Sequence, residues 1–80
     1  MENTEKTNLQ NLRQKKGLSQ SMLSAKSGVK MRAIQGYEQR DRRIEGAKLD
    51  TLCKLCFALD CKIEDILDDK ELIEKFRLAK

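Results

Sequence analysis

The sequence predicts an all-α fold, a compact domain of five short helices followed by a short C-terminal helical extension. Three observations support this prediction. The 80 residues include no proline, the residue that interrupts helices most strongly. Apolar residues recur at intervals of three and four positions, which is the spacing of one helix face. Residues that favour helix ends, above all Gly17, Ser19 and Gly28, lie between the apolar segments.

The first predicted helix follows a polar tail. Residues 1–6 are polar and are predicted to be disordered. Thr7 or Asn8 is suited to cap a helix that runs to Lys16, because its side-chain oxygen can accept a free amide hydrogen of the first turn. Gly17 then ends this helix.

The next two helices form a closely spaced pair. Ser19 caps a predicted helix over residues 20–27, and Gly28 ends it, since glycine enters the left-handed backbone region at little cost. A third helix is predicted over residues 31–39, although Gly36 within it is a poor helix former. Together they form a helix-turn-helix, which leaves one face of the later helix free.

The C-terminal half contains a loop and two further helices. Residues 40–48 are predicted to form a charged loop with Ile44 as its one apolar anchor. A fourth helix is predicted over residues 49–59 and a short fifth helix over residues 63–67. The apolar residues of the fourth helix that are expected to face inward are Leu49, Leu52, Leu55, Cys56 and Leu59.

Helical spacing continues beyond these five helices. Leu72, Ile73 and Phe76 recur at this spacing within residues 70–78. An apolar stripe of this kind packs either on its own domain or on a second subunit. The chain is therefore divided into a tail, a helical domain and a C-terminal extension, at residues 1–6, 7–68 and 69–80.

Positive charge is concentrated in the N-terminal half of the chain. Residues 9–43 contain nine lysines and arginines but only two acidic residues, whereas residues 44–80 contain seven basic and nine acidic residues. A basic segment of this kind favours a surface that meets a polyanion. The alternative is a basic face that is merely solvated.

Three cysteines, Cys53, Cys56 and Cys61, form the pattern C-x2-C-x4-C. A closed zinc site needs four ligands, and the chain has no histidine and no fourth cysteine. We therefore expect the three cysteines to be small buried side chains, with no metal and no cofactor.

The lack of histidine, of a nucleophile motif and of a phosphate-binding glycine loop argues against an enzyme.

Two further features bear on the location of the protein. No apolar run has transmembrane length, and the polar N-terminus shows no signal peptide. The odd number of cysteines favours a reducing compartment. We therefore expect a cytoplasmic protein without a membrane partner.

One ordered set of motifs runs through residues 12–67: LR…KG-LSQ, a small residue followed by GV, I-x-x-Y-E, L-x-T-L-x-K-L-x-x-A-L and I-x-D-I-L. With this set the chain resembles the Cro/repressor-type (XRE-like) helix-turn-helix DNA-binding family. The resemblance implies a lambda-repressor-like fold of five helices and a transcriptional regulator, such as a repressor, that binds double-stranded DNA sequence-specifically. It also implies a dimer on an inverted-repeat operator, with the recognition helix at about residues 31–39 in the major groove.

The resemblance further implies which side chains read DNA bases. Arg32 is the strongest candidate, because a guanidinium can bond guanine O6 and N7 together. Gly36 departs from the side-chain-bearing residue usual in the family and offers only a close approach of the backbone. For the other positions, plain exposure to solvent is the alternative. The base-reading positions are Met31, Arg32, Gln35 and Gly36.

A second set of positions is implied to contact phosphates. Lys30 and Lys48 occupy helix N-caps, as Lys62 does, where an oxygen-bearing side chain is usual; a phosphate could satisfy the free N–H groups at Lys30 and Lys48. Arg13 matches a salt-bridge partner of Glu38 and could be presented to a phosphate, with a purely structural role as the alternative. The phosphate positions are Ser19, Gln20, Lys30, Arg40, Arg42, Arg43, Lys48 and Arg13.

Four apolar residues are candidates for a dimer surface: Phe57, Ile63, Ile66 and Phe76. For the two aromatic residues we favour the alternative, in which Phe57 packs on Phe76 within one chain. The C-terminal stripe also supports a different function, an antitoxin-like or other protein-interaction module. The expected partners are therefore double-stranded DNA, a second copy of the chain and, in the alternative, another protein.

Overall fold

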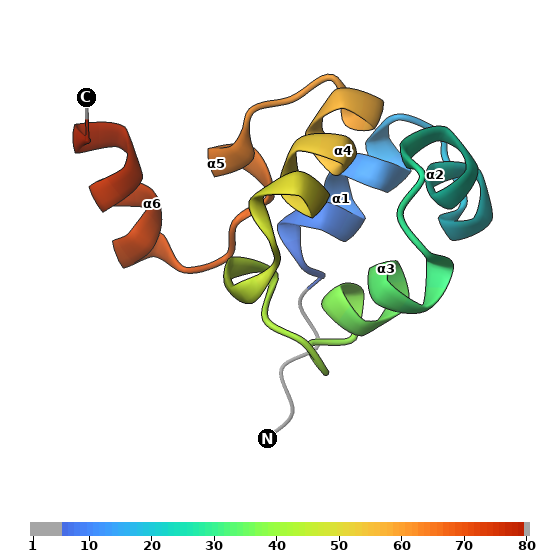
Figure 1. The fold of residues 1–80 in the computed structure, drawn as a ribbon, viewed down its shortest axis with the longest axis horizontal. Helices are drawn as coiled ribbons and strands as arrows, with labels where there is room; N and C mark the ends of the chain where they lie inside the picture. The colour runs from blue at the N-terminus through green and yellow to red at the C-terminus, as the bar shows by residue number, and fades with distance from the viewer. Residues whose placement is uncertain (1–5, 80) are drawn as a thin grey trace.

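The computed structural model describes residues 6–79, and the regular elements of this part of the chain are all helical (Figure 1). The all-α prediction is confirmed. The predicted disordered tail lies outside the described residues, apart from Lys6. The elements are α1 (Asn8–Lys15), α2 (Gln20–Ser27), α3 (Met31–Glu38), the 3-10 turn η1 (Ile44–Gly46), α4 (Leu49–Leu59), α5 (Ile63–Ile66) and α6 (Lys70–Leu78).

The helix ends lie within one residue of the predicted ones because local side chains determine them. The Thr7 hydroxyl oxygen accepts the Gln10 N–H at 3.1 Å, and the Ser19 hydroxyl oxygen accepts the Met22 N–H at 3.0 Å. Gly28 follows α2 with a φ of 81°, in the left-handed region. This turn lies between the two helices of the helix-turn-helix and brings α3 against α2.

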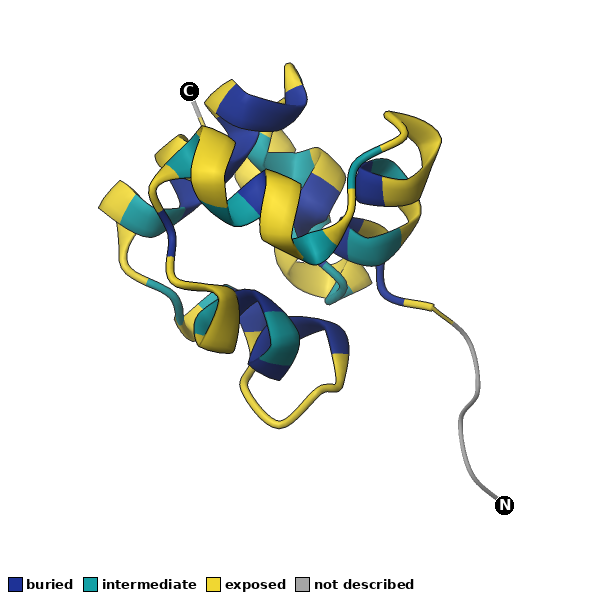
Figure 2. Ribbon diagram, turned by 90° about the vertical axis from the view of Figure 1, so that its right-hand side faces the viewer, coloured by how far each residue is buried: buried dark blue, intermediate teal, exposed yellow. Residues whose placement is uncertain are grey.

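The core lies where α1 to α5 converge, with exposed residues over the outer faces (Figure 2). Helix α2 packs on both α3 and α4, and α1 packs on α5. Ile44 is buried, so the predicted loop anchor is confirmed, and η1 is a short turn around it that sequence reasoning did not predict. The side chains with essentially no exposure are Leu9, Leu23, Ile34, Leu55, Leu59, Ile66 and Thr7.

The prediction that Leu49 faces inward is wrong. Exposure rises along one face of α4 toward its start, from 0% at Leu55 and 8% at Leu52 to 67% at Leu49. Leu49 has the spacing of a core residue, but it is the first residue of a helix that begins beyond the edge of the core.

Helix α6 stands to one side of the bundle, beyond α5 (Figure 1). Polar contacts hold it there. Glu45 accepts the N–H groups of Asp68 and Asp69, each at 2.7 Å, and Arg77 pairs with Glu64 at 3.0 Å. None of the α6 residues is fully buried. Ile73 packs partly buried against the core, while Leu72 and Phe76 are 38% and 46% exposed, so this chain covers the apolar face of α6 only in part.

The expected packing of Phe57 on Phe76 is also wrong, because Phe57 is 87% exposed. It lies two positions from both Leu55 and Leu59, and therefore on the opposite face of α4 from the core. Phe76 is 46% exposed. Among residues 6–79, none of the helices combines the length and the apolar character needed to cross a bilayer.

Candidate nucleic-acid interface

Helix α3 buries one face and presents the other. Ile34, Tyr37 and Glu38 are buried, whereas Met31 and Arg32 are exposed and Gln35 is half-buried. Because a helix turns about 100° per residue, Arg32 lies roughly 160° around α3 from Ile34. The side chain with the strongest base-reading chemistry therefore points away from the core.

A buried ion pair anchors the end of α3. Arg13 Nε donates to Glu38 Oε2 at 2.7 Å, and Arg13 Nη2 donates to Glu38 Oε1 at 3.0 Å. The two side chains are only 9% and 3% exposed. Arg13 Nη1 also donates to the Leu18 carbonyl at 2.8 Å. Its guanidinium is thus bound on three sides inside the protein, which is the structural role that the sequence left open.

The same network extends to two of the implied DNA contacts. Gln20 Nε2 donates to Glu38 Oε1 at 2.9 Å, and Gln35 Nε2 makes a long contact of 3.5 Å with Gln20 Oε1. Both glutamines are half-buried. The network therefore connects the first residue of α2 with Gln35 and Glu38 in the second half of α3.

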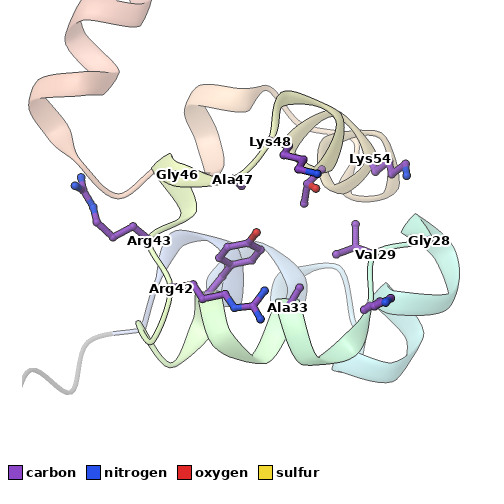
Figure 3. A pocket seen from close by; sticks show the side chains of 12 residues that line it. Gly28, Val29, Ala33, Arg42, Arg43, Gly46, Ala47, Lys48 and Lys54 are labelled. Atoms are coloured by element: carbon purple, nitrogen blue, oxygen red, sulfur yellow. The ribbon is translucent and has the colours of Figure 1, made fainter.

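A groove of about 680 Å³ lies between α3 and α4 (Figure 3). Its lining includes Val29, Ala33, Tyr37 and Ala47, which make it partly apolar. Basic side chains border it on both sides. The groove therefore suits a ligand that has negative charges for the basic rim and apolar groups for the apolar lining. The basic residues among its lining are Lys30, Arg42, Arg43, Lys48 and Lys54.

Two helix N-termini open beside this groove. Neither Lys30, at the start of α3, nor Lys48, at the start of α4, provides a side-chain acceptor for the first turn. The free N–H groups there carry partial positive charge, which adds to that of the lysines. At the start of α5 the Asp65 carboxylate accepts the Lys62 backbone N–H at 2.9 Å, although the Lys62 side chain cannot accept the N–H groups of the first turn.

The loop arginines diverge. Arg43 borders the groove, but its side chain is directed away from it, toward α6 (Figure 3). Arg43 Nη2 lies 3.4 Å from Asp69 Oδ2, and Arg43 Nε lies 3.8 Å from Glu45 Oε1. Arg40 is exposed at a φ of 63°. The structure therefore does not bring Arg43 together with the lysines of the groove.

Gly36 is buried because the Arg42 side chain lies over it. A Cβ atom built at Gly36 would lie 3.1 Å from Arg42 Cδ and 3.2 Å from Arg42 Cγ. Arg42 also donates its backbone N–H to the Gly36 carbonyl at 3.1 Å. What lies at the surface at this turn of α3 is therefore Arg42.

Sequence reasoning missed Lys54 and Thr51, which line the groove from α4. The signal was present as a spacing of three residues from Lys48 to Thr51 to Lys54, which keeps the three on neighbouring parts of one helix surface. Lys54 also pairs with Asp50 at 3.1 Å.

The dimer candidates are divided between core and surface. Ile66 is fully buried in the core, so it stabilises the fold of one chain and has no surface to offer. Ile63 is half-buried on α5, and Phe57 and Phe76 are exposed. Only these last three have side-chain surface that a second molecule could cover.

The three cysteines differ in burial. Burial, and then the neighbouring Cys61 thiol, raises the pKa of Cys56 to about 12, so its thiolate is scarce near neutral pH. The expectation that all three are buried holds for Cys56 and is wrong for Cys53, which is exposed; Cys61 is half-buried. Within residues 6–79, no group of three or more His, Cys, Asp or Glu side chains is arranged to hold a metal ion.

Comparison with protein families matches residues 8–71 to the Cro/C1-type HTH DNA-binding domain. The match extends from the start of α1 into the first turn of α6, and it includes the exposed face of α3 and both sides of the groove. No curated protein matches the chain. With four fifths of its length covered, the chain belongs to the Cro/C1-type helix-turn-helix DNA-binding family.

Proposed function

We propose that this protein is a sequence-specific transcriptional regulator of the repressor type that binds double-stranded DNA as a dimer on an inverted repeat. Residues 7–68 form its DNA-binding domain, and residues 69–80 form an extension that contributes to assembly. The observation that carries this proposal is the exposed outer face of α3 beside a groove bordered by Lys30 and Lys48, each at an uncapped helix N-terminus.

Each part of this surface has chemistry that suits one part of a DNA duplex. Arg32 can donate two hydrogen bonds to guanine, and Met31 can contact a thymine methyl group. The amide of Gln35 suits adenine, once it releases its long contact with Gln20. Lys30, Lys48 and the N–H groups beside them suit phosphates, as do the exposed hydroxyl of Ser19 and the side chains of Gln20 and Arg40.

Arg32→Ala is expected to relax sequence preference, and Lys48→Ala is expected to weaken binding to all sequences. Loss of a bidentate contact to guanine removes about 1–3 kcal/mol of discrimination at one base pair. Loss of a phosphate contact lowers affinity about equally for every sequence and reduces the salt slope by about 0.9 per protomer. The measurement begins with selection of bound duplexes from a random pool, followed by titration of the preferred duplex and its single-base variants.

Two results would contradict the proposal. If the wild-type protein binds no duplex at low salt, the regulator function is wrong. If Arg32→Ala loses the same factor on every sequence, Arg32 contacts only the backbone, and the major-groove placement of α3 loses its main support.

Self-association is proposed to use the apolar surface that α5 and α6 leave exposed, with Phe76 as its largest side chain. Phe76→Ser is expected to raise the dissociation constant of the dimer at least about tenfold, because truncation of a large aromatic anchor typically costs more than about 1 kcal/mol on each protomer. Sedimentation velocity over a range of concentrations measures this. Glu74→Ser is the matched control, since Glu74 is exposed two positions away and thus on the other side of α6. Equal dissociation constants for the two variants would exclude α6 from the interface.

A protein-interaction module, such as an antitoxin, is the second candidate function, and the exposed part of the apolar face of α6 favours it. A stoichiometric complex with a different protein, lost in Phe76→Ser and retained in Glu74→Ser, would support this function. It is compatible with DNA binding through α3, because α6 lies on the far side of α5 from α3 (Figure 1).

A further inference from the structure

The turn of α3 that contains Gly36 lies on the outer face of the helix. Gly36 is roughly 160° around the helix from the buried Ile34, and it follows Arg32 by one turn. A residue in this position would ordinarily be open to solvent. Gly36 is nevertheless buried, and the side chain that covers it comes from the loop after the helix.

The loop backbone brings Arg42 to this turn. The Arg42 N–H bonds to the Gly36 carbonyl at 3.1 Å. The Arg42 Cδ, Cγ and Nε atoms lie 3.1, 3.2 and 3.3 Å from the place of a Gly36 Cβ. From there the side chain follows α3 in the direction of Ala33 (Figure 3). Arg42 as a whole is exposed, so its stem lies on the helix and its guanidinium remains accessible.

We propose that Arg42 is a specificity-determining residue that reads a base edge in place of the side chain that Gly36 lacks. This inference rests on the proposed function, in which the outer face of α3 enters the major groove. A guanidinium that lies along that face meets base edges, where its paired donors match guanine O6 and N7. The lack of a Cβ at Gly36 is what leaves room for the Arg42 stem.

This role differs from the phosphate contact implied by the sequence. The lysines at the starts of α3 and α4 border the groove at helix N-termini, where phosphates bind. Arg42 lines the same groove, but its stem crosses the recognition helix at Gly36, one turn from Arg32. A phosphate contact and a base contact have different signatures, because only the base contact changes sequence preference.

The test compares base preferences of the wild type, Arg42→Ala and Gly36→Ala, each on the preferred duplex and its single-base variants. The wild type is expected to prefer guanine at one position of each half-site by about 5- to 150-fold over other bases. Arg42→Ala is expected to lose this preference and to keep the preferences that depend on Arg32. Lys48→Ala, as the comparison, is expected to keep both preferences while its affinity falls on all sequences.

Gly36→Ala separates reading from folding. Alanine is the better helix former, so this variant is expected to melt no lower than the wild type. Its Cβ takes the space that Arg42 Cδ and Cγ occupy, and the preference lost in Arg42→Ala is expected to weaken at the same base position. Adding Gly36→Ala to Arg42→Ala should then change base preference no further.

Two outcomes would overturn the inference. If Arg42→Ala loses the same factor on all duplexes, Arg42 is a phosphate contact, and the proposed function stands without it. If Gly36→Ala alters no base position while Arg42→Ala does, the packing of Arg42 on Gly36 does not set the preference. Failure of the wild type to bind any duplex would instead refute the proposed function. If the wild type does bind, a base preference that is lost in Arg32→Ala supports the proposed function independently of Arg42.

Discussion

Glu38→Ala is expected to lower the free energy of unfolding by about 3–5 kcal/mol, because it leaves the Arg13 guanidinium buried without its counter-charge. Arg13 donates two hydrogen bonds to this carboxylate, and Gln20 donates a third. Small domains are stable by only about 5–15 kcal/mol in total. The midpoint of thermal unfolding, followed by circular dichroism, should therefore fall by more than about 10 °C.

A double variant provides the control. Arg13→Met combined with Glu38→Leu removes both charges together, and replacing a buried ion pair with apolar side chains often costs little. The double variant is therefore expected to be more stable than Glu38→Ala. A midpoint for Glu38→Ala within two or three degrees of the wild type would show that Arg13 finds water or another acceptor, as an exposed arginine would.

The affinity for the preferred duplex is expected to fall about a thousandfold between about 50 and 200 mM monovalent salt. In the proposed complex, Lys30, Arg40 and Lys48 from both protomers of a dimer would provide about six contacts to phosphates. Each contact releases condensed counterions, so the logarithm of the binding constant falls with the logarithm of salt concentration, with a slope of about −5. Fluorescence anisotropy titrations at several salt concentrations measure the slope.

The position of the charges, and not only their number, determines this expectation. Lys75→Ala removes one exposed charge from α6, far from the groove, and should leave the slope unchanged. Lys48→Ala removes the same charge beside the groove and should make the slope shallower. Equal slopes for the two variants would mean that DNA does not approach the groove between α3 and α4.

The helices were predictable because short-range contacts determine them. The Ser19 cap and the Gly28 turn act within three or four residues of their own positions, so the sequence carries the whole signal. The pairing of Arg13 with Glu38 spans 25 residues, and it was expected only because the chain resembles a known family. The exposed position of Arg32 followed from the helical period together with that resemblance.

The wrong predictions concern residues whose burial depends on where a helix begins or on which other element covers it. Leu49 has the spacing of a core residue but lies beyond the edge of the core. Phe57 is exposed on the face of α4 opposite the core and is not covered by Phe76 of α6. The ion pair of Arg43 with Asp69, 26 residues distant in the extension, was not predicted either, and the phosphate contact expected of Arg43 stays a prediction. The packing of Arg42 on Gly36 depends on the path by which a loop returns to a helix, which helical periodicity does not describe.

The carboxylate of Glu45 has a mechanical consequence for the molecule. It belongs to η1, within the loop that borders the groove, and it holds the backbone just ahead of α6 through two hydrogen bonds of 2.7 Å. A displacement of the C-terminal helix when it meets another molecule would therefore pull on the segment that borders the groove proposed to meet DNA. If the proposed assembly and DNA binding both displace this segment, each would alter the affinity of the other by the same factor, as thermodynamic linkage requires.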